Sequence, residues 1–408
     1  MNTLILGLRN LRRNFRRSLT TALSIAFGFA AVALFSGYTK DVYRGLGEQA
    51  IHGELLGHLS LARRGMSKEG RLHPERYLLK TDEIEKIRAI VAHELPAAHL
   101  APRLSISGLA SNGRVSTIFL AEGIAPADMA KLRGPHAKSP GALTPDQPHG
   151  VTVGKGLAAL LGLKTGDEAS MLVSTLHGQA DMANVTLTGT YSTGNAGLED
   201  KAMFVPLALA RSLYDANGRA DRLSLLLPDI AQTEAARTRL AASFAAAGLD
   251  IETTTWQENS AFYRQVKGMF DMIFTFILAI VLTIVVMSVT NAMGMSVIER
   301  TREIGTLRAI GLRRRGVVRL FVGEALLLVG IGCLTGLALM LLVRAGVNAA
   351  DIGYVPPNGT ERVALTVGFD GGRLLFTTFL LAVLGLVAAW LPARRAARQP
   401  VIDALAHV

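Results

Sequence analysis

Four long stretches without charged side chains dominate the pattern of apolar and polar positions along the chain. They separate Arg17 from Lys40, Asp271 from Glu299, Glu324 from Arg344 and Arg373 from Arg394, with 22, 27, 19 and 20 uncharged residues in turn. A helix that crosses the hydrocarbon of a bilayer needs roughly 20 such residues. One run alone fits a buried helix of a soluble protein equally well, but four together predict transmembrane helices. These helices cover residues 18–39, 270–298, 320–343 and 373–393.

Residues 40–265 have a different, mixed pattern. Apolar residues at helical spacing predict a helix over Ala231–Ala247, and alternation of side chains predicts a strand over Ile251–Thr255. The fold class expected is an α+β membrane protein. It has four transmembrane helices in a 1+3 arrangement, with a large mixed α/β domain between helices 1 and 2. Residues 110–200 are expected to form a subdomain inserted into an outer framework.

The remaining segments flank the four predicted spans. Residues 1–17 place leucines at helical spacing between arginines, which predicts an amphipathic helix on the membrane surface; a disordered basic tail or a cleavable signal peptide are the alternatives. Trp256–Phe270 reads as a helix that continues into the second span. Residues 344–372 form a short outer loop, and residues 394–408 form a tail.

Composition agrees with a membrane protein. Half of the 408 residues are apolar and only 18% are charged, whereas soluble globular proteins carry about 25% charge. This balance argues against an ordinary cytosolic enzyme and against a disordered chain. The single cysteine, Cys333, excludes an intramolecular disulfide.

The positive charge is concentrated in three short segments. Residues 1–17, 299–319 and 394–408 together hold 15 basic and three acidic residues, whereas the rest of the chain holds 28 basic and 29 acidic residues. These segments alternate across the predicted spans, as the positive-inside rule requires of cytoplasmic loops. We therefore expect an inner-membrane, multi-pass protein with both termini in the cytoplasm and residues 40–265 in the periplasm. Nucleic-acid binding is not expected, because no basic domain rich in aromatic residues is present.

Patterns typical of catalysis do not occur in the sequence. There is no HExxH, CxxC or GxSxG motif, so no catalytic, metal-binding or cofactor-binding residues are assigned and the chain is not expected to be an enzyme. The stretch Gly150–Gly156 (GVTVGKG) superficially resembles a phosphate-binding loop. It lacks the glycine spacing and the Ser or Thr after the lysine, so it is interpreted as a strand, a turn and the start of a helix.

Three stretches carry a resemblance to a known family. Ser296–Leu327 contains Glu299-Arg300-Thr301-Arg302-Glu303-Ile304-Gly305 and Leu307-Arg308-Ala309-Ile310-Gly311, and Leu391–Arg398 reads LPARRAAR. The region before the second span contributes two further short matches to this resemblance, Pro102-Arg103-Leu104 and Glu122-Gly123-Ile124. The chain resembles the FtsX-like/MacB-like ABC transporter permease family, which includes LolC/LolE-type lipoprotein-releasing permeases. The resemblance implies a MacB-like periplasmic domain over residues 40–265.

The resemblance also implies that residues 299–310 form a coupling helix, which sits in a groove of an ATPase subunit. The residues assigned to ATPase coupling are Glu299, Arg300, Arg302, Glu303, Ile304, Leu307, Arg308 and Gly311. Glutamates in the first turn suit the helix dipole, Ile304 and Leu307 share one face, and Gly311 suits the C′ position. A solvated loop that only sets topology is the alternative. Glu324 is expected to pair with an arginine such as Arg319 or to anchor this helix.

Two glycines of the third span, Gly332 and Gly336, are assigned to helix packing. They have GxxxG spacing, which lets two helix backbones approach closely. The spacing fits a helix contact within the chain and an interface between two chains equally well.

The function implied by the resemblance is that of a permease subunit in an ATP-driven inner-membrane system. With no Walker motif in the chain, the resemblance implies a separate ABC ATPase that carries ATP and Mg²⁺. The further partners expected are a second permease copy or a related permease, a periplasmic or outer-membrane protein, and membrane lipid. The cargo expected is a lipoprotein, lipid or hydrophobic compound, released by mechanical transmission to the periplasmic domain; Gly134–Gly150 is a candidate hook for a carrier. The alternative is an FtsX-type signalling subunit that regulates cell-wall hydrolases and moves no cargo.

Overall fold

The computed structural model describes residues 13, 15–70, 72–134, 142–192, 196–355 and 362–405. The chain divides into two compact units. The first, here called the helical unit, comprises the chain up to Tyr43, Val266–Gly353 and the chain from Ala364 onward. The second, the sheet unit, comprises Arg44–Gln265 and Tyr354–Val363.

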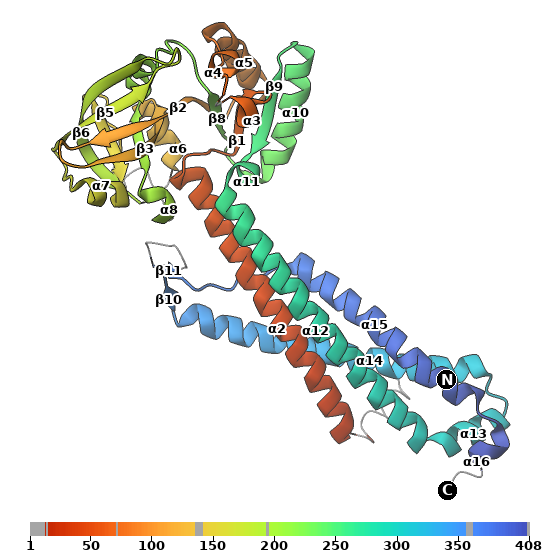
Figure 1. Cartoon of the computed structure of the whole chain (residues 1–408). Helices are drawn as coiled ribbons and strands as arrows, with labels where there is room; N and C mark the ends of the chain where they lie inside the picture. Colours follow the sequence, from red (N-terminus) through yellow and green to blue (C-terminus); the bar gives the residue numbers. More distant parts are fainter. Residues whose placement is uncertain are drawn as a thin grey trace. The chain divides into compact units, whose positions relative to one another are not determined.

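Four long helices build the helical unit (Figure 1). They are α2 (Phe15–Glu48), α12 (Ala261–Glu299), α14 (Arg314–Ala349) and α15 (Gly371–Arg398). All four are long and apolar enough to cross a membrane, which confirms the predicted four-helix class. At 1.5 Å per residue, the 39 residues of α12 reach about 58 Å, almost twice the roughly 30 Å of bilayer hydrocarbon. Helix α12 therefore extends well beyond a membrane.

The third long helix packs against the first through the two predicted glycines. A Cβ atom at Gly332 would lie 2.6 Å from Cγ2 of Ile25, and one at Gly336 would lie 2.6 Å from the carbonyl oxygen of Ala26. Both separations are too short for real atoms, so only glycine allows α14 to approach α2 this closely. The structure thus assigns the GxxxG pair to a contact within one chain.

Helix α15 contains a proline without losing its helical form. Pro392 has no N–H to donate to the carbonyl of Ala388, four residues earlier. The hydroxyl of Thr290 on α12 donates to that carbonyl instead, at 3.4 Å. Helix α15 continues to Arg398, so the predicted tail begins as helix. Its last turns carry the basic residues that follow the fourth apolar stretch.

Two short helices complete the helical unit, and two short strands lie where the chain passes from one unit to the other. Helix α13 (Thr301–Ala309) follows α12, α16 (Val401–Leu405) follows α15, and β10 (Gly353–Tyr354) pairs with β11 (Val363–Ala364). The surface helix expected over residues 1–17 lies largely outside the described residues. Phe15–Arg17 belong to α2 itself.

The sheet unit is built on nine strands. They are β1 (Leu59–Arg63), β2 (His99–Ser111), β3 (Ser116–Ile124), β4 (Gly150–Gly154), β5 (Glu168–Ser174), β6 (Ala180–Tyr191), β7 (Ala202–Pro206), β8 (Arg222–Leu226) and β9 (Ile251–Thr255). Their order is β3-β7-β4-β6-β5-β2-β8-β1-β9, and β2 also pairs with β3. Six strands therefore close on themselves as a barrel, and β8, β1 and β9 extend the sheet beyond it.

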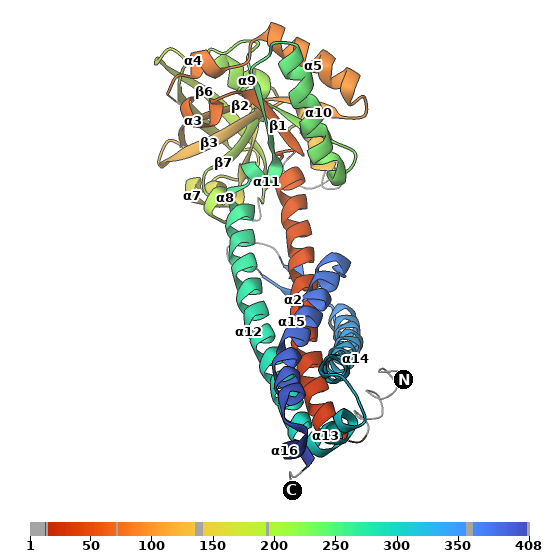
Figure 2. The same ribbon diagram turned by 90° about the vertical axis from the view of Figure 1, so that its right-hand side faces the viewer.

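Strand β2 belongs to both parts of this sheet. Its residues Arg103–Ser111 pair with β3, and His99–Arg103 pair with β8. One apolar core lies inside the barrel, and a second lies between the strands β8, β1 and β9 and the helices α5 (Thr81–Glu94) and α10 (Thr233–Ala246). We call these parts the barrel lobe and the frame lobe; both are visible in Figures 1 and 2. Strands β2 to β7, between His99 and Pro206, form the barrel lobe, whereas an inserted subdomain was expected over residues 110–200.

Shorter helices fill the connections of the sheet unit. They are η1 (Gln49–Gly53), α3 (Met66–Glu69), α4 (Pro74–Tyr77), α6 (Pro126–Arg133), α7 (Lys155–Leu161), α8 (Ala196–Glu199), α9 (Leu207–Leu213), η3 (Ile230–Gln232) and α11 (Trp256–Asn259). The GVTVGKG stretch forms β4 and the start of α7, as predicted. Residues 135–141 of the candidate hook loop, Gly134–Gly150, lie outside the described part of the chain.

The helix expected over Trp256–Phe270 is interrupted. Helix α11 ends at Asn259, and Ser260 has extended backbone angles before α12 begins. The side chains of Thr255 and Glu258 cap the start of α11 reciprocally. The rings of Trp256 and Tyr263, one on each side of the break, contact each other with centroids 4.7 Å apart.

Candidate coupling element of the helical unit

The link between the second and third long helices is a kinked turn of helix. Glu299 ends α12, Arg300 leaves helical geometry with φ −115° and ψ 14°, and α13 starts at Thr301. The prediction of one helix over residues 299–310 is therefore wrong at its start. Glu299 closes the preceding helix, whereas Glu303 does occupy the first turn of α13. The kink arises at the residue whose side chain turns into the protein.

Arg300 forms a buried ion pair with Glu324 on α14. Its Nη1 donates to Oε2 of Glu324 at 3.0 Å, and its Nε donates to Oε2 of Glu303 at 3.0 Å. Arg300 is 6% exposed and Glu324 is 4% exposed. The guanidinium also lies 5.4 Å from the centroid of the Phe321 ring. Glu324 thus anchors the coupling element, one of the two roles expected, and Arg300 rather than Arg319 is its partner.

The apolar face of α13 points toward the chain's own helices. Ile304 is 3% exposed and belongs to the same core as Val297, Val317 and Phe321. This contradicts the prediction that Ile304 contacts an ATPase. Spacing along the helix correctly placed Ile304 and Leu307 on one face, but it could not tell which way that face turns.

The exposed side of the element carries different residues. Arg302, Glu303 and Thr306 are exposed, Leu307 is half-buried, and Ile310 is 80% exposed. On the neighbouring α16, Ile402 is also exposed. Ile310 was not among the residues assigned to coupling, although it stands in the Leu307–Gly311 motif directly before the glycine that ends the helix.

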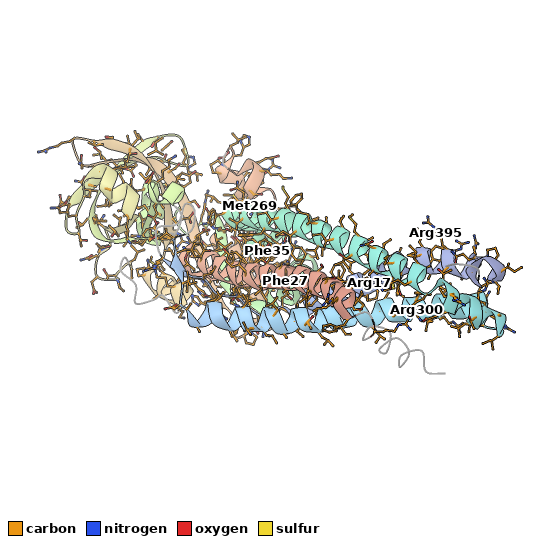
Figure 3. The ribbon with its side chains drawn as sticks, turned by 90° about the horizontal axis from the view of Figure 1, so that it is seen from below. Arg17, Phe27, Phe35, Met269, Arg300 and Arg395 are labelled. Atoms are coloured by element: carbon orange, nitrogen blue, oxygen red, sulfur yellow. The ribbon has the colours of Figure 1, made fainter. Side chains whose placement is uncertain are left out.

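Two arginines near the start of α2 bind glutamates on the two sides of the kink; Arg13 lies two residues before this helix, and Arg17 lies in its first turn. Arg13 donates from Nη2 to Oε1 of Glu303 at 2.8 Å, and Nη1 of Arg17 lies 2.9 Å from Oε2 of Glu299. Partial burial opposes ionisation of Glu303, but the hydrogen bonds from Arg13 and Arg300 outweigh it and hold the pKa of Glu303 below its usual value. Arg17 and Arg300 are labelled in Figure 3.

A glycine-dependent turn ends α13. Gly311 has φ +105°, a conformation that residues with a Cβ adopt only with strain. Its N–H donates to the carbonyl of Arg308 at 3.1 Å, and the N–H of Leu312 donates to the carbonyl of Leu307 at 3.0 Å. These two bonds define a Schellman motif, with Gly311 at C′ as predicted. The Arg308 guanidinium in turn donates to the carbonyl of Gln399, between α15 and α16.

These residues offer contacts rather than reaction chemistry. Within the described ranges, no three His, Cys, Asp or Glu side chains are grouped as metal ligands would be. The element joins α2, α12, α14 and α16 through ion pairs and a buried isoleucine. On the outside it leaves Ile310, which is 80% exposed, the less exposed Leu312 and charged neighbours.

Family models match two regions of the chain. The MacB-like periplasmic core domain matches residues 18–243, and the FtsX-like permease C-terminal region matches residues 275–401. Together the matched regions take in the coupling element and most of the sheet unit, whose residues 244–265 lie between the two matches.

Two relatives illustrate the similarity. The pyoverdine export ATP-binding/permease protein PvdT of Pseudomonas putida is 31% identical over 209 residues, which are 50% of this chain and 30% of that protein. The macrolide export ATP-binding/permease protein MacB of Escherichia coli K12 is 36% identical over 137 residues, 34% of this chain and 19% of that protein. The chain thus matches less than a third of the length of these curated relatives.

Solved structures are similar at low identity. The periplasmic region of MacB from Actinobacillus actinomycetemcomitans aligns with a TM-score of 0.35 at 13% identity, over 53% of this chain and 94% of that one. The extracellular domain of YknZ from Gram-positive bacteria aligns with a TM-score of 0.34 at 14% identity, over 49% and 100%. Because the model of the periplasmic core domain covers more than half of the chain, and the FtsX-like model covers the coupling element, this protein belongs to the MacB-like, FtsX-like family of ABC transporter permeases.

Proposed function

We propose that this chain is the permease subunit of an ATP-driven inner-membrane system, in which the segment from Arg300 to Leu312 receives motion from a separate ABC ATPase. The long helices α2 and α12 carry that motion to the periplasmic domain. The domain then extrudes or releases an amphiphilic cargo, such as a lipoprotein, a lipid or a hydrophobic compound. ATP and Mg²⁺ bind to the ATPase partner.

One observation carries this proposal: the coupling element is tied to both helices that lead into the sheet unit. Helix α12 runs directly into it through Arg300. Arg13, just before α2, pairs with Glu303 of the element, and Arg17 of α2 pairs with Glu299, the last residue of α12 before the kink. A push on α13 therefore acts on the two helices that enclose residues 44–265 in the sequence. A loop that only determined the orientation of the helices in the membrane would not need these ion pairs.

The buried side of the element supports a rigid connection. Ile304 in the core and the Arg300–Glu324 pair prevent α13 from tilting independently of α14. Breaking such a buried pair by removing one partner costs about 3–5 kcal/mol. Displacement of α13 is thus transmitted to the long helices instead of being absorbed locally.

Ile310 is the proposed apolar contact with the ATPase, with Arg302 beside it on the exposed side. Full burial of one isoleucine contributes about 1.5–3 kcal/mol. This energy changes the equilibrium constant for ATPase binding by a factor of about 10 to 100, since about 1.4 kcal/mol corresponds to a factor of ten. The contact is small, so a single substitution is expected to weaken it measurably.

The charge partition supports the proposed orientation. The described arginines of these segments lie at the same ends of the long helices as α13, and the positive-inside rule supports a cytoplasmic position for the coupling element and both termini. The sheet unit is then periplasmic. A second permease, identical or related, and a periplasmic or outer-membrane partner complete the proposed assembly.

The test compares Ile310→Asp with the same substitution at Ile230, an exposed isoleucine of the sheet unit. Tagged full-length chain is purified from cells that produce it with its ATPase, and the amount of ATPase recovered and its ATP turnover are measured. Ile310→Asp should lose most of the ATPase, whereas Ile230→Asp should retain it. An Ile310→Asp variant that inserts normally and keeps both ATPase and turnover would refute the coupling role.

A second measurement separates transport from the FtsX-type alternative. The complex is reconstituted in vesicles that contain a fluorescent lipid and a lipoprotein, and ATP-dependent release of either is followed. Release that stops in Ile310→Asp supports transport. Activation of a cell-wall hydrolase by ATP, with no release of lipid or lipoprotein, would favour the signalling function instead.

A further inference from the structure

A second arginine cluster lies at the same end of the helical unit, between the start of α14 and the end of α15. It borders an open hollow of about 750 Å³ on the surface of the helical unit. The lining residues are Arg314, Arg315, Val318, Arg319, Trp390, Arg394, Ala397 and Arg398. Five guanidinium groups from two helices thus face one space.

Among the residues that the structure describes, no paired carboxylate balances the charge of this cluster. Arg13 and Arg17, at the start of α2, each pair with a glutamate at 2.8–2.9 Å. By contrast, none of the five arginines around the hollow forms an ion pair with any carboxylate in the described part of the chain. Five like charges held together repel each other, so the arrangement favours a bound anion.

The hollow also has an aromatic wall. The guanidinium of Arg394 lies 4.9 Å from the centroid of the Trp390 ring, at cation–π distance. Trp390 is 46% exposed. Tryptophan is enriched at the level of the lipid head groups, where one end of its ring is apolar and the other is wet.

An exposed apolar stripe leads away from Trp390 along α15. Val387 and Val383 stand three and seven residues before it, on the same helix face, and both are exposed. Leu326 is exposed on α14. The site therefore combines a cationic end with an aliphatic track toward the middle of the membrane.

We propose that this hollow binds the phosphate head group of an anionic phospholipid, with one acyl chain along Val387 and Val383. Arginine is suited to phosphate because its planar fork donates two parallel hydrogen bonds. Basic pockets between transmembrane helices are typical sites for anionic lipid head groups. A free phosphate ion would use the arginines but not the aliphatic track, and an acidic protein segment would not need a track into the membrane. The site is independent of the cargo and of the proposed function.

Native mass spectrometry of the purified full chain tests the proposal. Dioleoylphosphatidylglycerol or dioleoylphosphatidylcholine is added in detergent at equal concentration, and the number of retained lipids is counted. We expect at least a tenfold preference for one molecule of phosphatidylglycerol. Equal retention of the two lipids would overturn the proposal. So would displacement of phosphatidylglycerol by an equal concentration of inorganic phosphate, because it would mean that the site recognises only the anion.

Paired variants then locate the site. Arg319→Gln with Arg394→Gln should remove the preference, and Arg319→Lys with Arg394→Lys should retain part of it. The matched control, Arg13→Gln with Arg16→Gln, removes the same charge from the same end of the helical unit and should retain all of it. Labelling of the buried Cys333 during heating shows whether each variant is folded. The lipid would bind elsewhere if the folded Arg319→Gln, Arg394→Gln variant kept the full preference for phosphatidylglycerol. The same conclusion would follow if the control variant lost as much of this preference.

Discussion

Each unit of this protein contains a buried cluster of charged side chains, and the two clusters are built differently. In the helical unit, Arg300 faces Glu324 at 3.0 Å in a pair that spans two helices. In the sheet unit, Glu122 faces two arginines, Arg103 at 3.1 Å and Arg222 at 2.5 Å. Arg300 pairs with Glu324 and also with Glu303, whereas Glu122 is paired with two arginines and keeps one of them if the other is lost. Loss of one member should therefore cost the pair more than the network.

The network also holds a strained piece of backbone. Arg103 is fully buried and donates from Nη1 to the carbonyl of Leu55 at 2.7 Å. Leu55 has φ +57°, an uncommon conformation for a residue with a Cβ. Burial opposes ionisation of Glu122, but Arg222 and Arg103 outweigh it and hold its pKa below the usual value. The network is therefore charged near neutral pH. Through Arg103 it holds the backbone at Leu55, shortly after the end of η1.

The largest effect is expected from Arg300→Met. It leaves Glu324 buried without its 3.0 Å partner, which should destabilise the helical unit by about 3–5 kcal/mol. Combining it with Glu324→Leu should recover most of the loss, because two apolar groups replace two charges. The measurement is the unfolding midpoint, reported by labelling of Cys333. Arg17→Gln, at the more exposed pair with Glu299, should cost less than about 1 kcal/mol.

Arg103→Met should have a smaller effect. Glu122 keeps Arg222, so the main loss is the charged hydrogen bond to the carbonyl of Leu55, about 2–3 kcal/mol. Urea unfolding followed by Trp256 fluorescence, in a Trp390→Phe background, reports on the sheet unit. If Arg103→Met lowered the free energy of unfolding as much as Arg300→Met does, the second arginine, Arg222, would not compensate for the loss of Arg103.

A third prediction concerns pH near this network. Burial raises the pKa of Glu54 to about 7 and lowers the pKa of His58 to about 4. Glu54 therefore stabilises the fold below about pH 4.5, and this contribution is lost as pH rises to 7. The contribution of neutral His58 has the opposite sign: it is present above about pH 6.5 and is lost as pH falls to 4.

Glu54→Gln separates these two effects. It should stabilise the sheet unit by about 2 kcal/mol at pH 8 and make no difference near pH 4. Trp256 fluorescence during urea unfolding, measured across this range, checks the prediction. An identical pH profile for variant and wild type would show that the carboxyl of Glu54 does not titrate in the folded protein over this range.

The smallest effect is expected from Gly311→Ala. At φ +105° an alanine costs about 1 kcal/mol, which weakens the turn after α13 without touching the Arg300–Glu324 pair. Gly346→Ala is the control, since a Cβ there meets no atom within 4 Å. A shift of the Cys333 labelling midpoint in Gly311→Ala that equals the shift in Arg300→Met would mean that the turn, rather than the buried pair, fixes the element.

Local sequence features predicted much of the fold. Uncharged runs located the four long helices, and Gly311 marked the end of α13 because a positive φ strongly favours glycine. The kink at Arg300 could not be predicted in this way, since it depends on Glu324, 24 residues away. The orientation of Ile304 and the exposure of Ile310 depend likewise on how α13 packs. Barrel closure rests on the pairing of β3 with β7, which links residues about 80 positions apart.

The frame lobe has a consequence for the order of folding. Strands β1 and β9 are neighbours, with Leu59 opposite Thr255, although they lie near opposite ends of the sheet unit in sequence. Closing so long a loop has an entropic cost that grows with its length. The barrel lobe lies within that loop and closes on itself, so folding it first shortens the flexible chain between β1 and β9. We therefore expect the barrel to form early and β9, which leads back toward the membrane helices, to complete the sheet last.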